Sequence, residues 1–196
     1  MEEKDLINRI LQGESTLFAS IIKQTQGLVA QIVFKLIKNP EDRKDLVQDI
    51  YLKTYKNLST FQFQSKLSTW IGQIAYNTCL AYLGKKKLIL PDGYDSAHEN
   101  EETLLEYLSN KTLSAHDNET EQLLFRAELS ELIQSIIETL PPIYKLLITL
   151  YHYEELSYDE MACIADLPVG TVKNYLFRAR KALKDRLLKN YSNEIL

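Results

Sequence analysis

Apolar side chains recur at intervals of three and four residues along most of this chain, and this spacing constrains the fold more than any other feature. One such stripe, which ends before Asn39-Pro40, comprises Leu17, Ile21, Leu28, Ile32 and Leu36. The spacing places these side chains on one face of a helix. The 196 residues include only 6 glycines and 5 prolines, so few positions oppose helix formation. We therefore expect an all-α fold.

Composition excludes several classes of protein. The chain is 45% hydrophobic and 26% charged, which is unlike a disordered chain, collagen or a disulfide-rich scaffold. Its two cysteines, Cys79 and Cys163, are too few for a four-ligand zinc site, and His98, His116 and His152 lie at no ligand spacing. We expect neither a metal nor a cofactor.

The N-terminus and the most apolar segment bear on localisation. The first five residues are largely acidic, whereas a signal peptide begins with basic residues before an apolar core. The most apolar stretch, 28–37, is interrupted by Gln31 and Lys35 and is far shorter than the roughly 20 residues of a membrane span. We expect a cytoplasmic protein without membrane insertion, with its cysteines reduced.

The net charge of −4 conceals an uneven distribution. Residues 1–87 carry 13 Lys and Arg against 8 Asp and Glu, residues 88–120 carry 1 against 8, and residues 121–196 carry 9 against 11. Within the last part, residues 168–190 carry 7 against 1. Localised positive charge of this kind suits nucleic-acid binding. We predict two small helical domains, 1–87 and 121–196, joined by an acidic flexible linker at 88–120.

A helix beginning at Pro40 is expected to carry a polar strip. Proline in the first turn, followed by Glu41 and Asp42, favours a helix start. One strip of its outer face, at positions i, i+3, i+4 and i+7, holds Asp45, Gln48, Asp49 and Leu52. Such a strip is usually only solvated, although an apolar leucine beside carboxylates also suits a partner helix.

The next loop and helix combine aromatic, amide and basic side chains. Phe61 and Phe63 lie in a polar loop, and Ser68 is the expected N-cap of the helix that follows. Away from the apolar face of that helix we expect Gln73, Tyr76 and Asn77, and the helix runs into Lys85, Lys86 and Lys87. Rings stack on bases, amides bond base edges and lysines bind phosphates, so the segment suits single-stranded nucleic acid. The alternative is structural, with Trp70 in the core and the loop phenylalanines tucked under it.

The C-terminal domain contains a short helix, a tight turn and a longer helix, which is the helix-turn-helix arrangement. Ser157 and Glu160 form a capping-box pattern, Ala162 is small where the helices cross, and Asp166 tolerates the left-handed backbone of the turn. The outer face of the last helix holds Lys173, Asn174, Phe177, Arg178, Arg180, Lys181 and Lys184. Such a face suits base edges and phosphates of duplex DNA. The alternative is a merely solvated cationic helix.

Four motifs follow one another along the chain: Asp45-Leu-Val-Gln-Asp, Leu67-Ser-Thr-Trp-Ile-Gly-Gln-Ile-Ala-Tyr-Asn77, Ser157-Tyr-Asp-Glu-Met-Ala, and the segment from Val169 to Leu183. In this order they resemble regions 2 and 4 of bacterial extracytoplasmic-function (ECF) sigma factors, the small promoter-specificity subunits of RNA polymerase. The resemblance implies a region 2 helical bundle at 1–87 and a region 4 helix-turn-helix domain at 121–196. It implies a protein that is not an enzyme, binds RNA polymerase core, recognises −35 duplex and −10 melted DNA, and directs transcription initiation.

The resemblance also assigns roles to matched positions. It implies binding to the coiled coil of the largest polymerase subunit for Asp45, Leu46, Gln48, Asp49 and Leu52. It implies contact with the −10 element for Phe61, Phe63, Ser65, Lys66, Trp70, Gln73 and Asn77. It implies contact with the −35 element for Thr171, Lys173, Asn174, Phe177, Arg178, Arg180 and Lys181. The family alone implies an anti-sigma partner. The chain departs from the family pattern at Ala81, Gly84 and Tyr175.

The linker length sets a condition on DNA binding. Its 33 residues reach about 110 Å when extended, but a flexible coil of this length averages roughly 30 Å. Two DNA elements two helical turns apart lie roughly 70 Å from each other. We therefore expect polymerase to hold the domains apart, and the isolated protein to bind duplex promoter DNA weakly and with little selectivity.

A stand-alone DNA-binding regulator is the competing interpretation. It would explain residues 157–190 equally well, with the N-terminal helices forming a dimerisation or sensor domain. It assigns no function to the 61–77 segment or to lysines 85–87. It predicts a stable dimer on palindromic half-sites.

Overall fold

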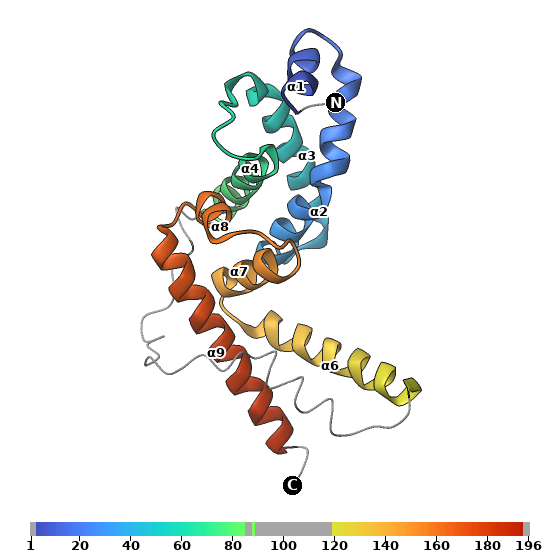
Figure 1. The fold of residues 1–196 in the computed structure, drawn as a ribbon, viewed down its shortest axis with the longest axis vertical. Coiled ribbons are helices and arrows are strands. Elements are labelled where there is room, and N and C mark those ends of the chain that lie inside the picture. Colours follow the sequence, from blue (N-terminus) through green and yellow to red (C-terminus); the bar gives the residue numbers. More distant parts are fainter. Residues whose placement is uncertain (1–2, 85–87, 89–118, 194–196) are drawn as a thin grey trace.

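The computed structural model describes residues 3–84, 88 and 119–193, and every regular element in these ranges is helical. The α-helices are α1 (Glu3–Leu11), α2 (Phe18–Leu36), α3 (Pro40–Asn57), α4 (Leu67–Tyr82), α6 (Glu119–Thr139), α7 (Pro142–His152), α8 (Tyr158–Ala165) and α9 (Val169–Asn193) (Figure 1). Short 3-10 turns lie at Ser15–Leu17 and Leu58–Thr60. The predicted all-α fold is confirmed. Except for Leu88 and the start of α6, the predicted linker at 88–120 lies outside the described residues.

Helix α2 is the centre of the N-terminal bundle and packs against α3, α4 and α7. Its apolar stripe is buried as the periodicity predicts, with Ile21, Val29, Ile32 and Val33 fully enclosed. By length and hydropathy alone, Ser15–Leu36 is sufficient to cross a bilayer. This helix is longer than the apolar stretch 28–37, and core helices of folded proteins pass the same test. Within this fold the helix is a core element covered by its neighbours.

Local signals place the start of α3. The side chain of Asn39 accepts a hydrogen bond from the backbone N–H of Glu41 at 3.2 Å, and Pro40 occupies the first turn. The missing N–H of proline costs nothing there, because the first N–H groups of a helix have no intrahelical acceptor. The predicted start at Pro40 is confirmed.

Helix α4 differs from its prediction in two respects. It begins at Leu67, with Lys66 at the N-cap and no side-chain capping bond, so the predicted cap at Ser68 is wrong. Tyr76, expected away from the buried face, is only 1% exposed. The reason is tertiary: α8 packs on α4 and buries a second face of the helix.

The helix-turn-helix forms as its sequence predicts. The Ser157 hydroxyl accepts the N–H of Glu160 at 3.3 Å, while a Glu160 carboxylate oxygen accepts the N–H of Ser157 at 2.9 Å. Asp166 ends α8 in the left-handed conformation, with φ 51° and ψ 50°. Helix α6 precedes the helix-turn-helix and begins at Glu119.

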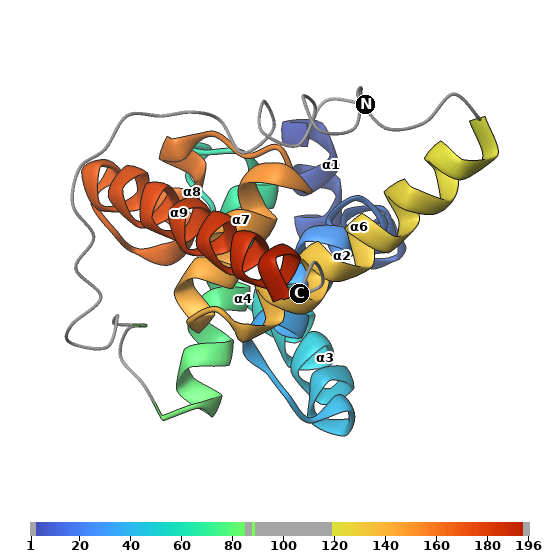
Figure 2. The same cartoon turned by 90° about the horizontal axis from the view of Figure 1, so that it is seen from below.

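The two predicted domains pack directly on each other. Helix α7 lies against α2, and α8 lies against α4 (Figures 1 and 2). Buried residues of both domains belong to one hydrophobic core. Each domain keeps its own local helices, but the described chain forms a single packed body.

Candidate nucleic-acid interface

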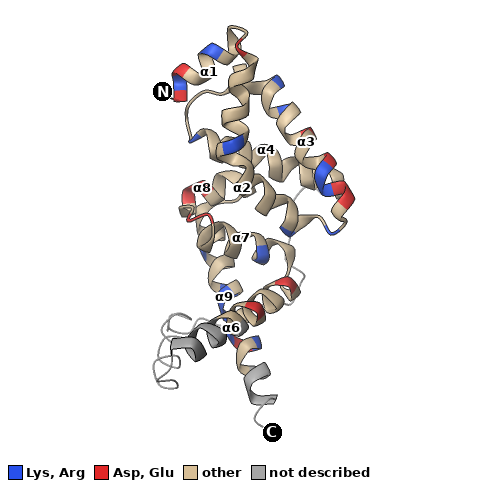
Figure 3. Cartoon of the chain, turned by 90° about the vertical axis from the view of Figure 1, so that its right-hand side faces the viewer, with Lys and Arg blue, Asp and Glu red and all other residues tan. Residues whose placement is uncertain are grey.

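The outer face of α3 presents the strip expected from the sequence. Asp45, Gln48 and Asp49 are exposed, and Leu52 is 57% exposed. Leu46 is instead buried, so it holds α3 on the bundle and does not face a partner. Charged residues gather along α3 (Figure 3). The strip thus combines two carboxylates, an amide and an exposed leucine on one helix.

The loop between α3 and α4 carries an aromatic cluster. Phe61 is only 6% exposed, and its ring centre lies 4.8 Å from that of Phe63 and 5.3 Å from that of Trp70. Phe63 is 43% exposed and has φ +57°, a left-handed conformation that a bulky side chain rarely adopts. The buried Phe61 ring therefore lies between the partly buried Trp70 ring and the Phe63 ring, which projects from a strained backbone.

The same loop and the helix that follows it also carry polar and basic groups. The Lys66 side chain is 73% exposed, Asn77 is exposed, and Ser65 and Gln73 are half-buried. Lys4 of α1 places its ammonium group 5.8 Å from the centre of the Phe63 ring, a contact that the sequence analysis missed. No spacing rule connects residues so far apart in the chain. Lysines 85–87 lie outside the described residues.

Helix α9 separates a buried face from a cationic face. Val172, Leu176 and Ala179 are buried. Lys173 and Asn174 are exposed, and the partly exposed members of the predicted −35 set are Thr171, Phe177, Arg178, Arg180 and Lys181. Tyr175 instead packs edge-on against Tyr144, with ring centres 6.1 Å apart. This departure from the family pattern therefore has a structural role.

Two tyrosines position cations on this face, and the sequence analysis missed both. Tyr151 of α7 and Tyr158 of α8 stack with ring centres 5.6 Å apart. The Arg180 guanidinium lies 4.6 Å from the centre of the Tyr151 ring, and the Lys173 ammonium lies 5.4 Å from that of Tyr158. Cations over ring faces are attracted electrostatically. The aromatic pair therefore helps to fix the positions of two charges.

The charge of Arg180 also affects the protonation of a nearby histidine. Burial, and then the nearby positive charge of Arg180, lower the pKa of His152, which keeps the imidazole neutral near pH 7. The positive charge here thus comes from arginine and lysine. Among the described residues, no three histidine, cysteine or carboxylate side chains are grouped as a metal site would require.

The fold brings the loop between α3 and α4 next to the helix-turn-helix. The Lys66 ammonium lies 2.8 Å from a carboxylate oxygen of Glu160, in the first turn of α8. Burial acts to raise the pKa of Glu160, but Lys66 and the Ser157 bonds outweigh it, and the pKa is lowered. The Glu160 carboxylate is therefore ionised at neutral pH.

Comparison with known proteins agrees with the division into an N-terminal helical bundle and a C-terminal helix-turn-helix domain. Residues 21–89 match Sigma-70 region 2, and residues 130–183 match Sigma-70, region 4. A helical bundle followed by a helix-turn-helix, each matching a sigma-70 region, defines the class of sigma-70-type initiation factors.

Full-length relatives narrow the class to one family. The ECF RNA polymerase sigma-E factor of Haemophilus influenzae KW20 Rd is 31% identical over 190 residues, covering 95% of this chain and 96% of that protein. The corresponding factor of Escherichia coli K12 is 32% identical over 187 residues, covering 95% of each. The chain belongs to the ECF sigma factor family, whose members direct transcription initiation by RNA polymerase.

Solved structures share the fold. CnrH in complex with the cytosolic domain of CnrY superposes with a TM-score of 0.62 at 18% identity, covering 94% of this chain and 96% of that one. The sigma factor RpoE of Bartonella quintana, in complex with the anti-sigma factor NepR, gives 0.57 at 18% identity, covering 87% and 96%.

Proposed function

We propose that the three surfaces described above divide promoter recognition among them. The α3 strip of Asp45, Gln48, Asp49 and Leu52 binds the coiled coil of the largest polymerase subunit. Two carboxylates and an exposed leucine on one helical face suit a partner helix that offers basic and apolar side chains. Leu46 contributes by anchoring α3.

Phe63 is the group that stacks on an extruded base of the −10 element. Its ring is exposed, supported by Phe61 and indirectly by Trp70, while Lys66 supplies a positive charge for phosphate. Gln73 and Asn77 offer amide groups for base edges, and Ser65 offers a hydroxyl group. Extruding a base costs a few kcal/mol of lost stacking and pairing. Stacking on an aromatic ring returns about 1–3 kcal/mol, which stabilises the melted strand.

Helix α9 binds the −35 element in the major groove. Its exposed N-terminal residues, Lys173 and Asn174, are suited to base edges and phosphates. Arg178, Arg180 and Lys181 add phosphate contacts further along the helix, and Thr171 and Phe177 flank them. Core polymerase binds DNA without promoter specificity, and this protein supplies it.

The protein acts as an initiation factor in the cytoplasm and catalyses no reaction itself. Nucleotide addition belongs to the polymerase, because the sigma factor contributes binding energy and not reacting groups. An anti-sigma factor is the expected regulator, since one structural neighbour is a sigma factor solved with the anti-sigma factor NepR.

The match of both sigma regions within one full-length alignment carries this proposal. Pull-down with bacterial core RNA polymerase tests it, comparing the unmodified chain with Asp49→Arg. We expect retention of the former and loss of the latter, because arginine reverses the charge in the centre of the strip. Asp5→Arg, an equal charge reversal on exposed α1, is the matched control and should be retained.

Failure of the unmodified chain to retain core polymerase would contradict the proposal. Combined with a clean dimer on gel filtration, that result would favour a stand-alone DNA-binding regulator.

A further inference from the structure

Two stacked tyrosines lie beside the proposed −35 surface. Tyr151 is in the last turn of α7, and Tyr158 is the first residue of α8. Their ring centres lie 5.6 Å apart, and the ring planes differ by only 26°. Both rings are partly buried and pack on the hydrophobic core. The two rings therefore form one aromatic surface that two helices share.

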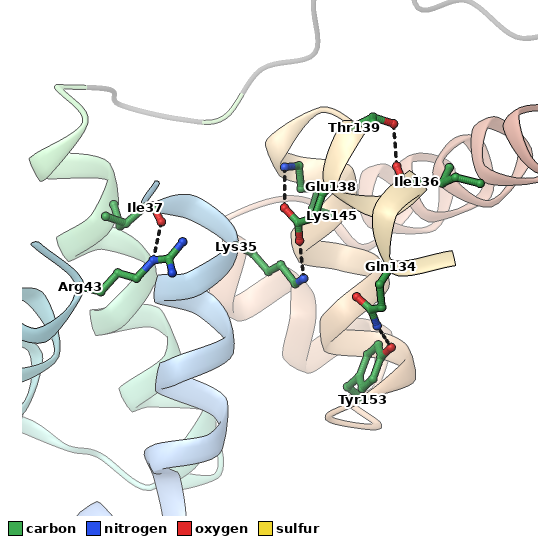
Figure 4. A network of polar contacts seen from close by, with 9 residues as sticks. All are labelled: Lys35, Ile37, Arg43, Gln134, Ile136, Glu138, Thr139, Lys145 and Tyr153. Atoms are coloured by element: carbon green, nitrogen blue, oxygen red, sulfur yellow. Dashed lines mark hydrogen bonds and ion pairs between the residues drawn. The ribbon is translucent and has the colours of Figure 1, made fainter. Parts of the chain in front are cut away.

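Contacts at other positions hold the helices that carry these rings. Lys145 of α7 donates a hydrogen bond at 3.0 Å to Glu138 of α6, which also accepts one from Lys35 of α2 at 2.7 Å (Figure 4). The capping box fixes the start of α8, where Tyr158 lies. The backbone positions of both tyrosines are thus set by contacts that do not involve α9.

Each ring lies under one cation of α9. Lys173 and Arg180 are seven residues apart, which is almost two helical turns, so their side chains leave the same face of the helix. The Lys173 ammonium lies 5.4 Å from the centre of the Tyr158 ring, and the Arg180 guanidinium lies 4.6 Å from that of Tyr151. The stacked pair is therefore spaced to contact two cations of one helical face at the same time.

An aromatic partner and a carboxylate partner affect DNA binding differently. A carboxylate beside a basic side chain repels a phosphate that approaches it. A ring attracts the cation through its quadrupole and carries no net charge, so the positive charge still attracts phosphate. Long basic side chains also lose conformational entropy when DNA fixes them. A ring that already restricts such a side chain reduces this cost of binding.

We propose that Tyr151 and Tyr158 are positioning residues for binding of the −35 element. In the free protein their rings hold Arg180 and Lys173 on the face of α9 that meets DNA, so that binding has less side-chain motion to restrict. The inference deepens the proposed function and rests on it for the contact between α9 and DNA.

NMR relaxation of the Arg180 Nε–H group tests, in the free full-length chain, whether the rings hold the cations. We expect an order parameter above about 0.6 in the unmodified protein and below about 0.6 in Tyr151→Leu. Tyr151→Phe keeps a ring and should match the unmodified chain. Tyr153→Leu is the matched control, because Tyr153 is 54% exposed and its hydroxyl accepts a hydrogen bond from Gln134 of α6 (Figure 4).

Promoter binding by the holoenzyme, reconstituted with bacterial core RNA polymerase, tests whether this positioning favours DNA binding. The probe is a DNA duplex that the unmodified holoenzyme selects from a random-sequence library. Tyr151→Leu should weaken binding about 3- to 10-fold, because it removes one cation–π contact and the ordering that this contact provides. Tyr151→Phe and Tyr153→Leu should change binding by less than about 2-fold.

A double-mutant cycle separates positioning from support of the fold. Arg180→Gln removes the cation that Tyr151 holds, so adding Tyr151→Leu to it should weaken binding no further. A tyrosine that only stabilises α7 would weaken binding by the same factor in both backgrounds. Lys173→Gln with Tyr158→Leu forms a second cycle with the same expectation.

Equal factors in both backgrounds would overturn the proposal. An Arg180 order parameter that is below about 0.6 in the unmodified chain, or that Tyr151→Leu leaves unchanged, would do the same. If Tyr151→Leu loses its cooperative thermal transition, the cycle at Tyr158 decides the result.

Failure of the proposed function would give a different pattern. If Arg180→Gln leaves promoter binding unchanged, the role of Arg180 at the −35 element fails, and the positioning role of Tyr151 fails with it. If core polymerase is not retained at all, the proposed function fails, while the order parameters still decide whether the rings hold the cations.

Discussion

At the scale of a single residue, Phe63 combines a left-handed backbone conformation with an exposed ring. A left-handed conformation at a non-glycine residue costs about 1–3 kcal/mol. The ring gains only partial burial in return, because it remains 43% exposed. Folding alone does not account for a phenylalanine here, whereas the proposed stacking on a base would account for it.

Phe63→Gly should therefore separate stability from function. Glycine relieves the backbone strain and removes a half-exposed ring, so the free energy of unfolding should change by less than about 1 kcal/mol. Transcription from a promoter that the unmodified protein uses should fall about 5- to 150-fold, which corresponds to about 1–3 kcal/mol of lost stacking. Urea unfolding and run-off transcription measure the two quantities.

Phe61→Ala is the contrasting control, because this ring is buried. Removing it should cost about 3–5 kcal/mol of stability. Full transcription by Phe63→Gly would eliminate Phe63 as the stacking residue.

Arg180 should contribute to the lowered pKa of His152. Burial is the larger cause of the lowered pKa and the charge of Arg180 is the smaller one. In Arg180→Ala the pKa of His152 should therefore rise but stay below its usual value of 6.5. NMR titration of the imidazole measures this shift. An unchanged pKa would show that Arg180 does not act on the histidine, and Lys173→Ala is the matched removal of a cation elsewhere on the same face.

At the scale of a helix, the capping box stabilises the first helix of the helix-turn-helix. Ser157→Ala removes the acceptor for the Glu160 N–H and should lower the free energy of unfolding by about 1 kcal/mol. Ser157→Thr keeps a hydroxyl group and should lose much less. Urea unfolding compares the three proteins, and equal losses in alanine and threonine would contradict a capping role.

Elements with local signals could be predicted from the sequence, and those without could not. The helix start at Pro40, the Ser157–Glu160 box and the left-handed Asp166 are short-range features, and all three are confirmed. The predicted cap at Ser68 is wrong because α4 begins two residues earlier, at Leu67, with Lys66 at the N-cap. The burial of Tyr76 depends on α8, which lies more than eighty residues further along the chain.

At the scale of the whole molecule, contact between the regions should depend on pH through Glu138. Burial acts to raise its pKa, but the bonds from Lys35 and Lys145 outweigh it and hold the pKa below its usual value of 4.5. A lowered pKa in the folded state contributes stability above pH 4.5 and loses it as pH falls through the lowered value. The free energy of unfolding, measured with urea at a series of pH values, should therefore decrease as the pH falls below about 4.5.

Glu138→Gln should remove part of this pH dependence, because glutamine does not titrate. Glu131→Gln, a change on the exposed surface of the same helix, should retain it. If the loss at low pH were equally large in Glu138→Gln, other carboxyl groups would be responsible for it.

The sequence by itself determined the helical class, the order of the two regions and the chemistry of their surfaces. Apolar periodicity, caps and charge distribution act over a few residues, and the order of the four motifs needs no coordinates. The polar strip on α3 and the cationic face of α9 follow from helical spacing alone.

Only the tertiary structure decided which of these residues face solvent and which face each other. It buries Leu46 and Phe61 and projects Phe63. It also brings Tyr151 under Arg180 and sets Ile164 against Gly72. These contacts join residues that are far apart in the chain. They are determined by the packing of whole helices, and short-range sequence patterns carry no information about that packing.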